Sequence, residues 1–251
     1  MASNALPPAL SSMSVSLPEQ QVLQALLDAT FLRRRSMDRR GPLPRRLRLR
    51  AAAAAGAASR KEFDLWRSII MEQYPAGCED LTLRPPIRTQ RFGETRGVES
   101  RINECYLFHG TCWQNAVDIL RRGFRSPEAP EAPKAIPRTL RIAPMLRGGI
   151  FLAECSSKAD EYSDPSPGEN LTPCTLLLCR ALLGKPLRLR HGERRQRVKD
   201  MLEAAQADSV VVDLESTCHS YREFVFADPC QVLPEYLLVY ERIFRSKPKK
   251  W

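Results

Sequence analysis

Several features that mark particular protein classes are missing from this sequence. None of its eight cysteines forms a Cys-x-x-Cys pair, and its three histidines (His109, His191 and His219) lack zinc-finger spacing. We therefore expect no metal. The first twenty residues lack the continuous apolar core of a secretory signal, and no apolar run could span a membrane. These absences predict reduced thiols in an intracellular protein, in nucleus or cytoplasm, without a membrane partner.

Acidic residues are scarce only at the start of the chain, which has a formal charge of +10. Residues 1–60 hold ten arginines and three acids, or +7, and the remainder holds 29 basic and 26 acidic residues, or +3. Any contact with nucleic acid is therefore expected through the N-terminal segment, because the rest is close to neutral.

Residues 1–60 are also biased in composition. A Ser- and Pro-rich start leads into the run RRRSMDRRGPLPRRLRLR and then AAAAAGAASR. Only Val22, Leu23, Leu26, Leu27 and Phe31 form a short amphipathic helical face. Such a composition is typical of an organelle transit peptide, a nuclear localisation signal, a nucleic-acid-binding arm or a disordered linker. We predict a disordered, low-complexity segment over 1–60 and a folded domain over 61–251.

The folded part reads as a mixture of helices and strands. Apolar spacing predicts a helix over 62–72, and residues 75–96 are loop-like. Residues 126–139 form a proline-rich loop, and long irregular loops are usually functional or mobile. Strands are expected at 148–153, 175–183, 209–212, 221–228 and 235–244. Ser156 or Ser157 could cap a short helix that ends near Tyr162. This order indicates an α+β domain.

The stretch 106–125, YLFHGTCWQNAVDILRRGFR, carries the first candidate site. Its apolar start suits a strand, and apolar residues at helical spacing follow until Gly123, which suits a helix terminus. His109 and Gly110 lie between the two elements, where a small molecule could be held. This stretch alone is weak evidence for a site, since an isolated histidine more often has a structural role.

A second candidate lies in the strand YREFVF. Its alternation places Tyr221, Glu223 and Val225 on one face, and Arg222 with two phenylalanines on the other. A carboxylate that shares a face with apolar neighbours is out of place unless it is paired or used. Glu223 is therefore a candidate functional residue.

Four segments, in this order, resemble the catalytic domain of the poly(ADP-ribose) polymerase family, which has a diphtheria-toxin-like ADP-ribosyltransferase fold. They are LFHGT, N-x-x-x-I-L-x-x-G-F-R, GGIFLAECSSKADEYS and YREFVFADPCQVLPEYLLVYER. The resemblance covers about residues 62–245 and is densest at 104–125, 148–163 and 219–243. It implies an α+β fold of two packed, mostly antiparallel sheets with flanking helices.

The resemblance also implies an NAD site. His109 matches the histidine that hydrogen-bonds a ribose hydroxyl, and Gly110 the glycine whose backbone reads the nicotinamide carboxamide. Tyr162 matches the tyrosine that stacks on nicotinamide, and Glu223 the catalytic glutamate. Two more matches are Thr111, for the adenosine ribose, and Arg125, on the adenine side.

Two positions depart from the family pattern. Phe151 replaces a tyrosine that lines the cofactor, and Ala159 replaces a serine that hydrogen-bonds the carboxamide. Each lost neutral hydrogen bond should cost about 0.5–1.5 kcal/mol, which weakens an enzyme without abolishing it. Lys158 has two interpretations. Its side chain either positions a phosphate or the acceptor, or lies in solvent without a role at the site.

The implied activity is NAD-dependent protein ADP-ribosylation, with NAD as co-substrate and nicotinamide as product. The acceptor is a protein, either another protein or this chain itself. Elongation to poly(ADP-ribose) stays open. Because of Phe151 and Ala159, one alternative is a weak or inactive module of the same fold that binds NAD or a partner. Another is a basic nucleic-acid-binding protein that works through residues 33–50.

Overall fold

The computed structural model describes residues 11–39, 41–56, 59–78, 83, 85–125, 146–147, 149–163, 174–189, 196–218 and 220–244. The proline-rich loop predicted at 126–139 and His219 lie outside them. The helices are α2 (Leu17–Ala29), α3 (Arg60–Gln73), α4 (Gln90–Thr95), α5 (Trp113–Arg122), α6 (Ser156–Ala159), α7 (Val198–Ala205) and α8 (Glu215–Cys218), with 3-10 turns η1 (Ser100–Ile102), η3 (Asp160–Tyr162) and η4 (Pro229–Gln231). The strands are β1 (Arg46–Ala54), β2 (Glu104–Gly110), β3 (Leu146–Arg147), β4 (Ile150–Ala153), β5 (Cys174–Leu182), β6 (Pro186–Leu189), β7 (Gln196–Arg197), β8 (Ser209–Asp213), β9 (Arg222–Phe226) and β10 (Val232–Ile243).

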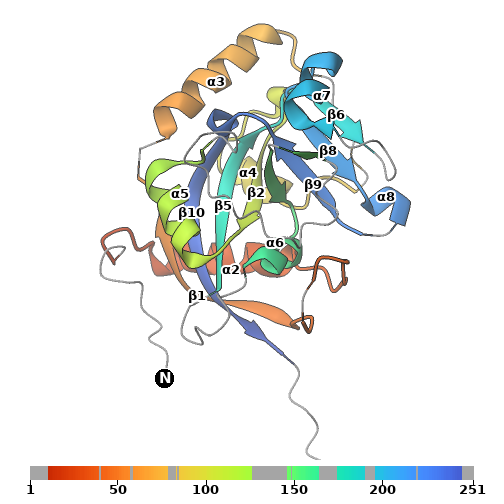
Figure 1. Cartoon of the computed structure of the whole chain (residues 1–251). Helices are drawn as coiled ribbons and strands as arrows, with labels where there is room; N and C mark the ends of the chain where they lie inside the picture. The colour runs from red at the N-terminus through yellow and green to blue at the C-terminus, as the bar shows by residue number, and fades with distance from the viewer. Residues whose placement is uncertain are drawn as a thin grey trace, which may run out of the picture.

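Eight strands form one sheet in the order β1-β10-β5-β2-β4-β9-β8-β6 (Figure 1). Its pairs are antiparallel except for β6 and β8, which run parallel, and the short strands β3 and β7 pair separately. The predicted α+β class is therefore confirmed, whereas the expectation of two packed sheets is wrong. A single pairing, Phe108 with Ala153, is what joins β2 to β4 and makes the sheet continuous.

Helices cover both faces of the central strands, and β5 shows how. Leu176 and Leu178 are fully buried in the core cluster that contains the apolar face of α2. Their neighbours Leu177 and Cys179 point the other way, into the cluster with α5. Each buried leucine contributes about 1.5–3 kcal/mol of burial free energy, so the two-sided cover stabilises the sheet strongly.

The described parts of the N-terminal segment (11–39, 41–56 and 59–60) contribute to this core, so the predicted disorder is wrong for these residues. Of the predicted helical face, Leu23, Leu26 and Leu27 of α2 are buried, whereas Val22 is 42% exposed. Strand β1 runs antiparallel to β10 along the sheet edge (Figure 1). Its Arg-Leu-Arg-Leu start has the period of a strand. Of its alanines, Ala52 packs in the cluster with α2, and Ala51 and Ala53 pack in the cluster with α5.

The arginines of this segment have acidic partners. Six of them form ion pairs: Arg34 with Glu215, Arg39 with Asp160, Arg46 with Asp28, both Arg48 and Arg50 with Glu241, and Arg60 with Glu235. Much of the basic charge that suggested a nucleic-acid arm is therefore balanced within the fold.

Most local predictions hold. The helix predicted over 62–72 is α3, whose Phe63 and Ile70 are buried. The region expected to be loop-like, 75–96, contains the short helix α4. Neither serine caps α6, because the residue before its first turn is Cys155. Within the described ranges, none of the helices combines the length and apolarity needed to cross a membrane.

Candidate active site

A cavity of about 190 Å³ lies where β2 and β4 diverge. A small heterocycle can be accommodated in a space of this size. The wall consists of Phe108, His109 and Gly110 from β2, Phe124, Gly149, Ile150 to Ala153 of β4, Lys158, Ala159, Tyr162 and Glu223. Five of the predicted site residues therefore meet around one space: His109, Gly110, Phe151, Tyr162 and Glu223.

His109 bridges the two strands that border the cavity. Its Nδ1 lies 2.9 Å from the carbonyl oxygen of Phe151, and its ring meets Phe124 edge to face at 5.1 Å. Burial lowers the pKa of His109 below its usual value of 6.5, and the hydrogen bond to Phe151 only partly opposes this. The imidazole is therefore neutral at pH 7. Since a carbonyl can only accept, Nδ1 carries the proton and Nε2 is left as an acceptor.

Gly110 is required by a close backbone contact. A Cβ atom at this position would lie 1.8 Å from the carbonyl oxygen of Ala159 and 3.2 Å from Cβ of Tyr162. Without a side chain at residue 110, β2 can lie directly against α6 and η3, which carry Lys158 and Tyr162. The glycine thus determines the width of the cavity.

We expect Gly110→Ala to destabilise the protein by about 1–3 kcal/mol, as overpacking does, because the clash is with backbone. Urea unfolding followed by circular dichroism measures this. Gly56→Ala is the matched control, since no atom lies within 4 Å of a Cβ added there. Equal midpoints for the two variants would contradict the close contact.

Lys158 is buried, so the interpretation of its side chain as solvated is wrong. Its side chain is only 4% exposed, and Nζ lies 3.1 Å from Oε1 of Glu223. The same nitrogen lies 2.6 Å from Asp38 and 3.2 Å from Glu161. Burial alone would lower the pKa of Lys158, but the negative charge around it, that of Glu223 foremost, raises the pKa above its usual value. Lys158 is therefore a permanent ammonium.

Tyr162 and Phe151 supply the aromatic surface of the cavity. The Tyr162 hydroxyl lies 3.0 Å from Lys158 Nζ and donates to Oδ2 of Asp38 at 2.9 Å. Burial raises the pKa of Tyr162, so the phenol stays neutral. Phe151, also on the wall, keeps a ring face but has no hydroxyl to fix a ligand.

The other two predicted residues do not line the cavity. The Thr111 hydroxyl is 3.4 Å from Nδ2 of Asn115. Arg125 forms an ion pair with Asp118 at 3.7 Å, and its side chain is 41% exposed. Thr111 directly follows β2 and Arg125 comes after α5, so an extended ligand would have to leave the cavity to reach them.

The sequence reasoning did not identify Asp38 and Glu161. Asp38 is one of three acids in the first sixty residues, where composition suggested disorder. Glu161 precedes the predicted tyrosine, but no pattern marked it. Together with Glu223 they place three carboxylates around one ammonium. The charged groups on the cavity wall are Lys158 and Glu223, whereas Asp38 and Glu161 lie behind Lys158, and Glu161 also pairs with Arg39 at 3.5 Å. No group of His, Cys, Asp and Glu among the described residues suits a metal ion.

The comparison with known families agrees with this geometry. The model of the poly(ADP-ribose) polymerase catalytic domain matches residues 82–242, well over half of the chain. No curated protein resembles the chain closely enough to be matched with it. The family match contains His109, Gly110, Lys158, Tyr162 and Glu223, whereas Asp38 lies before it. The chain belongs to the poly(ADP-ribose) polymerase catalytic-domain family.

Proposed function

We propose that the protein cleaves the bond between nicotinamide and ribose in NAD and transfers ADP-ribose to a protein acceptor. Members of its family are generally NAD-dependent ADP-ribosyltransferases. The observation that carries the proposal is the carboxylate of Glu223 on the wall of the cavity that His109, Gly110 and Tyr162 also line.

The charge of the site suits this reaction. Nicotinamide is already cationic in NAD and leaves as a neutral ring, so its departure needs no general acid. The ribose left behind develops positive charge, as in glycoside hydrolysis. Glu223 would stabilise this charge and accept a hydrogen bond from a ribose hydroxyl. Preorganised groups of this kind are typically worth about 10²–10³ in rate.

The remaining groups would hold the substrate. Tyr162 offers a ring for stacking on nicotinamide, and the backbone of Gly110 would read its carboxamide. Nε2 of His109 can accept a hydrogen bond from a ribose hydroxyl, since Nδ1–H donates to the carbonyl of Phe151. Lys158 would orient Glu223 through their 3.1 Å contact rather than touch a phosphate.

The competing function is a module of the same fold that holds NAD or a partner without turnover. Phe151 and Ala159 favour it, because each lacks a hydroxyl that the family pattern has. Losing two neutral hydrogen bonds costs about 1–3 kcal/mol, or roughly ten- to a hundredfold. The intact pair of His109 and Glu223 favours the enzyme. Release of nicotinamide from NAD by the purified chain, followed by chromatography, distinguishes the two.

The rate of nicotinamide release should fall as the pH is lowered through the pKa of His109. The pKa of His109 lies below 6.5, so the ring is neutral above that pH and gains a proton as the pH drops through the lowered value. Protonation turns Nε2 into a donor and removes the acceptor for the ribose hydroxyl. A rate profile between pH 4.5 and 8 tests this.

The control is His109→Gln, whose amide oxygen can accept but does not titrate. We expect this variant to be slower and to lose the acid limb assigned to the imidazole. An acid limb of the same position and depth in both proteins would assign the titration to another group.

A further inference from the structure

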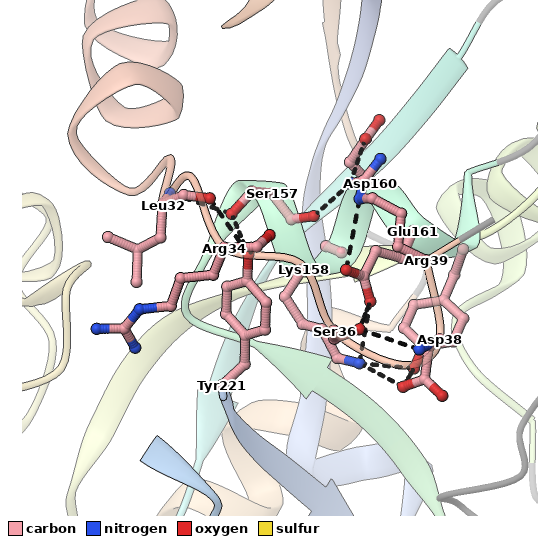
Figure 2. A network of polar contacts seen from close by, with 12 residues as sticks. Leu32, Arg34, Ser36, Asp38, Arg39, Ser157, Lys158, Asp160, Glu161 and Tyr221 are labelled. Carbon is pink, nitrogen blue, oxygen red and sulfur yellow. Dashed lines mark hydrogen bonds and ion pairs between the residues drawn. The ribbon is translucent and has the colours of Figure 1, made fainter. Parts of the chain in front are cut away.

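The segment that links α2 to β1 crosses the back of the site. We call residues 30–39 the N-terminal strap. Figure 2 shows it running along α6 and η3, with Ser36, Asp38 and Arg39 pointing toward Lys158, Asp160 and Glu161. The strap lies outside the family match at 82–242.

Buried contacts hold the strap along its length. At its start the amide of Leu32 donates to Oγ of Ser157 at 3.1 Å. In the middle, the hydroxyl of Tyr221 donates to the carbonyl of Arg34 at 2.8 Å (Figure 2). At its end, Arg39 pairs with Asp160 at 2.8 Å, and its side chain is only 2% exposed. These contacts tie the strap to Ser157, Tyr221 and Asp160.

Asp38 makes the contacts that reach the cavity. Its Oδ2 lies 2.6 Å from Nζ of Lys158 and 2.9 Å from the hydroxyl of Tyr162. The Asp38 side chain is 6% exposed and does not line the cavity, whereas Lys158 and Tyr162 do. Ser36 supports this arrangement: it accepts from the amide of Asp38 at 3.2 Å and donates to Glu161 at 2.6 Å.

We propose that Asp38 is a positioning residue of the active site, which holds the ammonium of Lys158 and the ring of Tyr162 from behind. The proposal rests on the proposed function, because it takes the cavity as the nicotinamide site. Through Lys158 the aspartate sets the carboxylate of Glu223, and through the hydroxyl of Tyr162 it sets the stacking surface. The catalytic unit of this chain then begins before the family domain, at the strap.

The chemistry explains why a carboxylate is needed there. Lys158 has three carboxylate neighbours, and Asp38 is the nearest at 2.6 Å. Without that charge the ammonium would be drawn toward Glu223 and Glu161. Glu223 would then be engaged more tightly by its own lysine and would be less available to a ribose hydroxyl. The Tyr162 hydroxyl would lose its charged acceptor at the same time.

The test compares Asp38→Asn with Asp28→Asn in the full chain. Asp28 lies in the same N-terminal segment but pairs with Arg46 at the surface, where its side chain is 36% exposed. We expect Asp38→Asn to lower kcat/KM for NAD about 10- to 100-fold, as small misplacements of catalytic groups do, and to weaken the binding of nicotinamide itself. Asp28→Asn should change neither, and melting curves report whether each variant is folded.

A double-mutant cycle with Lys158→Met separates positioning from general damage. If Asp38 acts through Lys158, its replacement should cost much less in the Lys158→Met background than in the wild type. A loss of the same size in both backgrounds would show that Asp38 does not act through Lys158. The same result with Tyr162→Phe in place of Lys158→Met would remove the second route as well and overturn the proposal.

Two further outcomes separate this proposal from the proposed function. If the wild type releases nicotinamide and Asp38→Asn behaves like Asp28→Asn, the positioning role is wrong and the function stands. If the wild type binds nicotinamide without turnover, and Asp38→Asn weakens that binding, the transferase function is wrong and the positioning role stands. A wild type that neither binds nicotinamide nor cleaves NAD overturns both.

Discussion

Replacing Glu223 by glutamine should slow the release of nicotinamide from NAD by about 10²–10³-fold. Glutamine keeps the shape of the side chain and can accept a hydrogen bond, but it removes the negative charge that faces the developing cation. The fold should tolerate the change, because Lys158 keeps Asp38 at 2.6 Å and Glu161 at 3.2 Å. The measurement is steady-state nicotinamide release at saturating NAD.

Glu241→Gln provides the matched control. Glu241 lies on β10 of the same sheet, and its side chain is 36% exposed beside Arg48 and Arg50. Exposed ion pairs contribute about 0–1 kcal/mol, so this variant should keep the wild-type rate. Equal rates for Glu223→Gln and wild type would remove Glu223 from the mechanism.

Replacing Glu154 by glutamine should lower the free energy of unfolding by about 3–5 kcal/mol. Glu154 and Arg222 form a two-pronged ion pair at 2.6 and 2.8 Å, and both side chains are fully buried. Arg222 also donates to the carbonyls of Pro85 and Pro86. Glutamine would leave its guanidinium without a full counter-charge in the interior. Denaturant unfolding of the purified variant measures the loss.

The contrasting variant is Asp118→Asn, which breaks an exposed pair. Asp118 lies 3.2 Å from Arg122 one helical turn away, with side chains 46% and 66% exposed. Such pairs contribute about 0.3–0.5 kcal/mol, so the midpoint should hardly move. If the two variants were equally stable, burial of the Glu154–Arg222 pair would not be what anchors β9.

Much of the site follows from short-range pattern. The apolar start of β2, the helical spacing of α5 and Gly123 after its last residue are all local signals, and the structure confirms each of them. The alternation in β9 also separates Glu223, at the cavity, from Arg222, which is buried against Glu154. A period of two is enough to tell these neighbours apart.

The N-terminal segment shows where pattern reading failed. Arginine and alanine are typical of disordered tails, and the prediction of disorder was based on that composition. It did not take account of the strand period in residues 46–50. What makes β1 a strand is its partner β10, almost 200 residues later, together with the cover of α2. Sheet continuity is non-local in the same way, since the single pairing of Phe108 with Ala153 joins its two halves.

The role of Asp38 could not be predicted from the sequence, for a related reason. Its contacts with Lys158 and Tyr162 span 120 and 124 residues of sequence. Nothing in the local sequence distinguishes an acid that neutralises neighbouring arginines from one that holds a distant lysine. Only the folded strap brings Asp38 to the site.

The most direct test of the account is transfer of label from NAD to protein. The purified full chain is incubated with NAD labelled in its adenylate part, beside Glu223→Gln, and both are separated on a denaturing gel. We predict that the wild-type protein is labelled, as a discrete band if a single ADP-ribose is transferred or as a smear if the chain is elongated. In the variant the band should be lost, or the smear should collapse to a band. Absence of label in the wild type, or equal labelling of both proteins, would contradict a transferase that depends on Glu223.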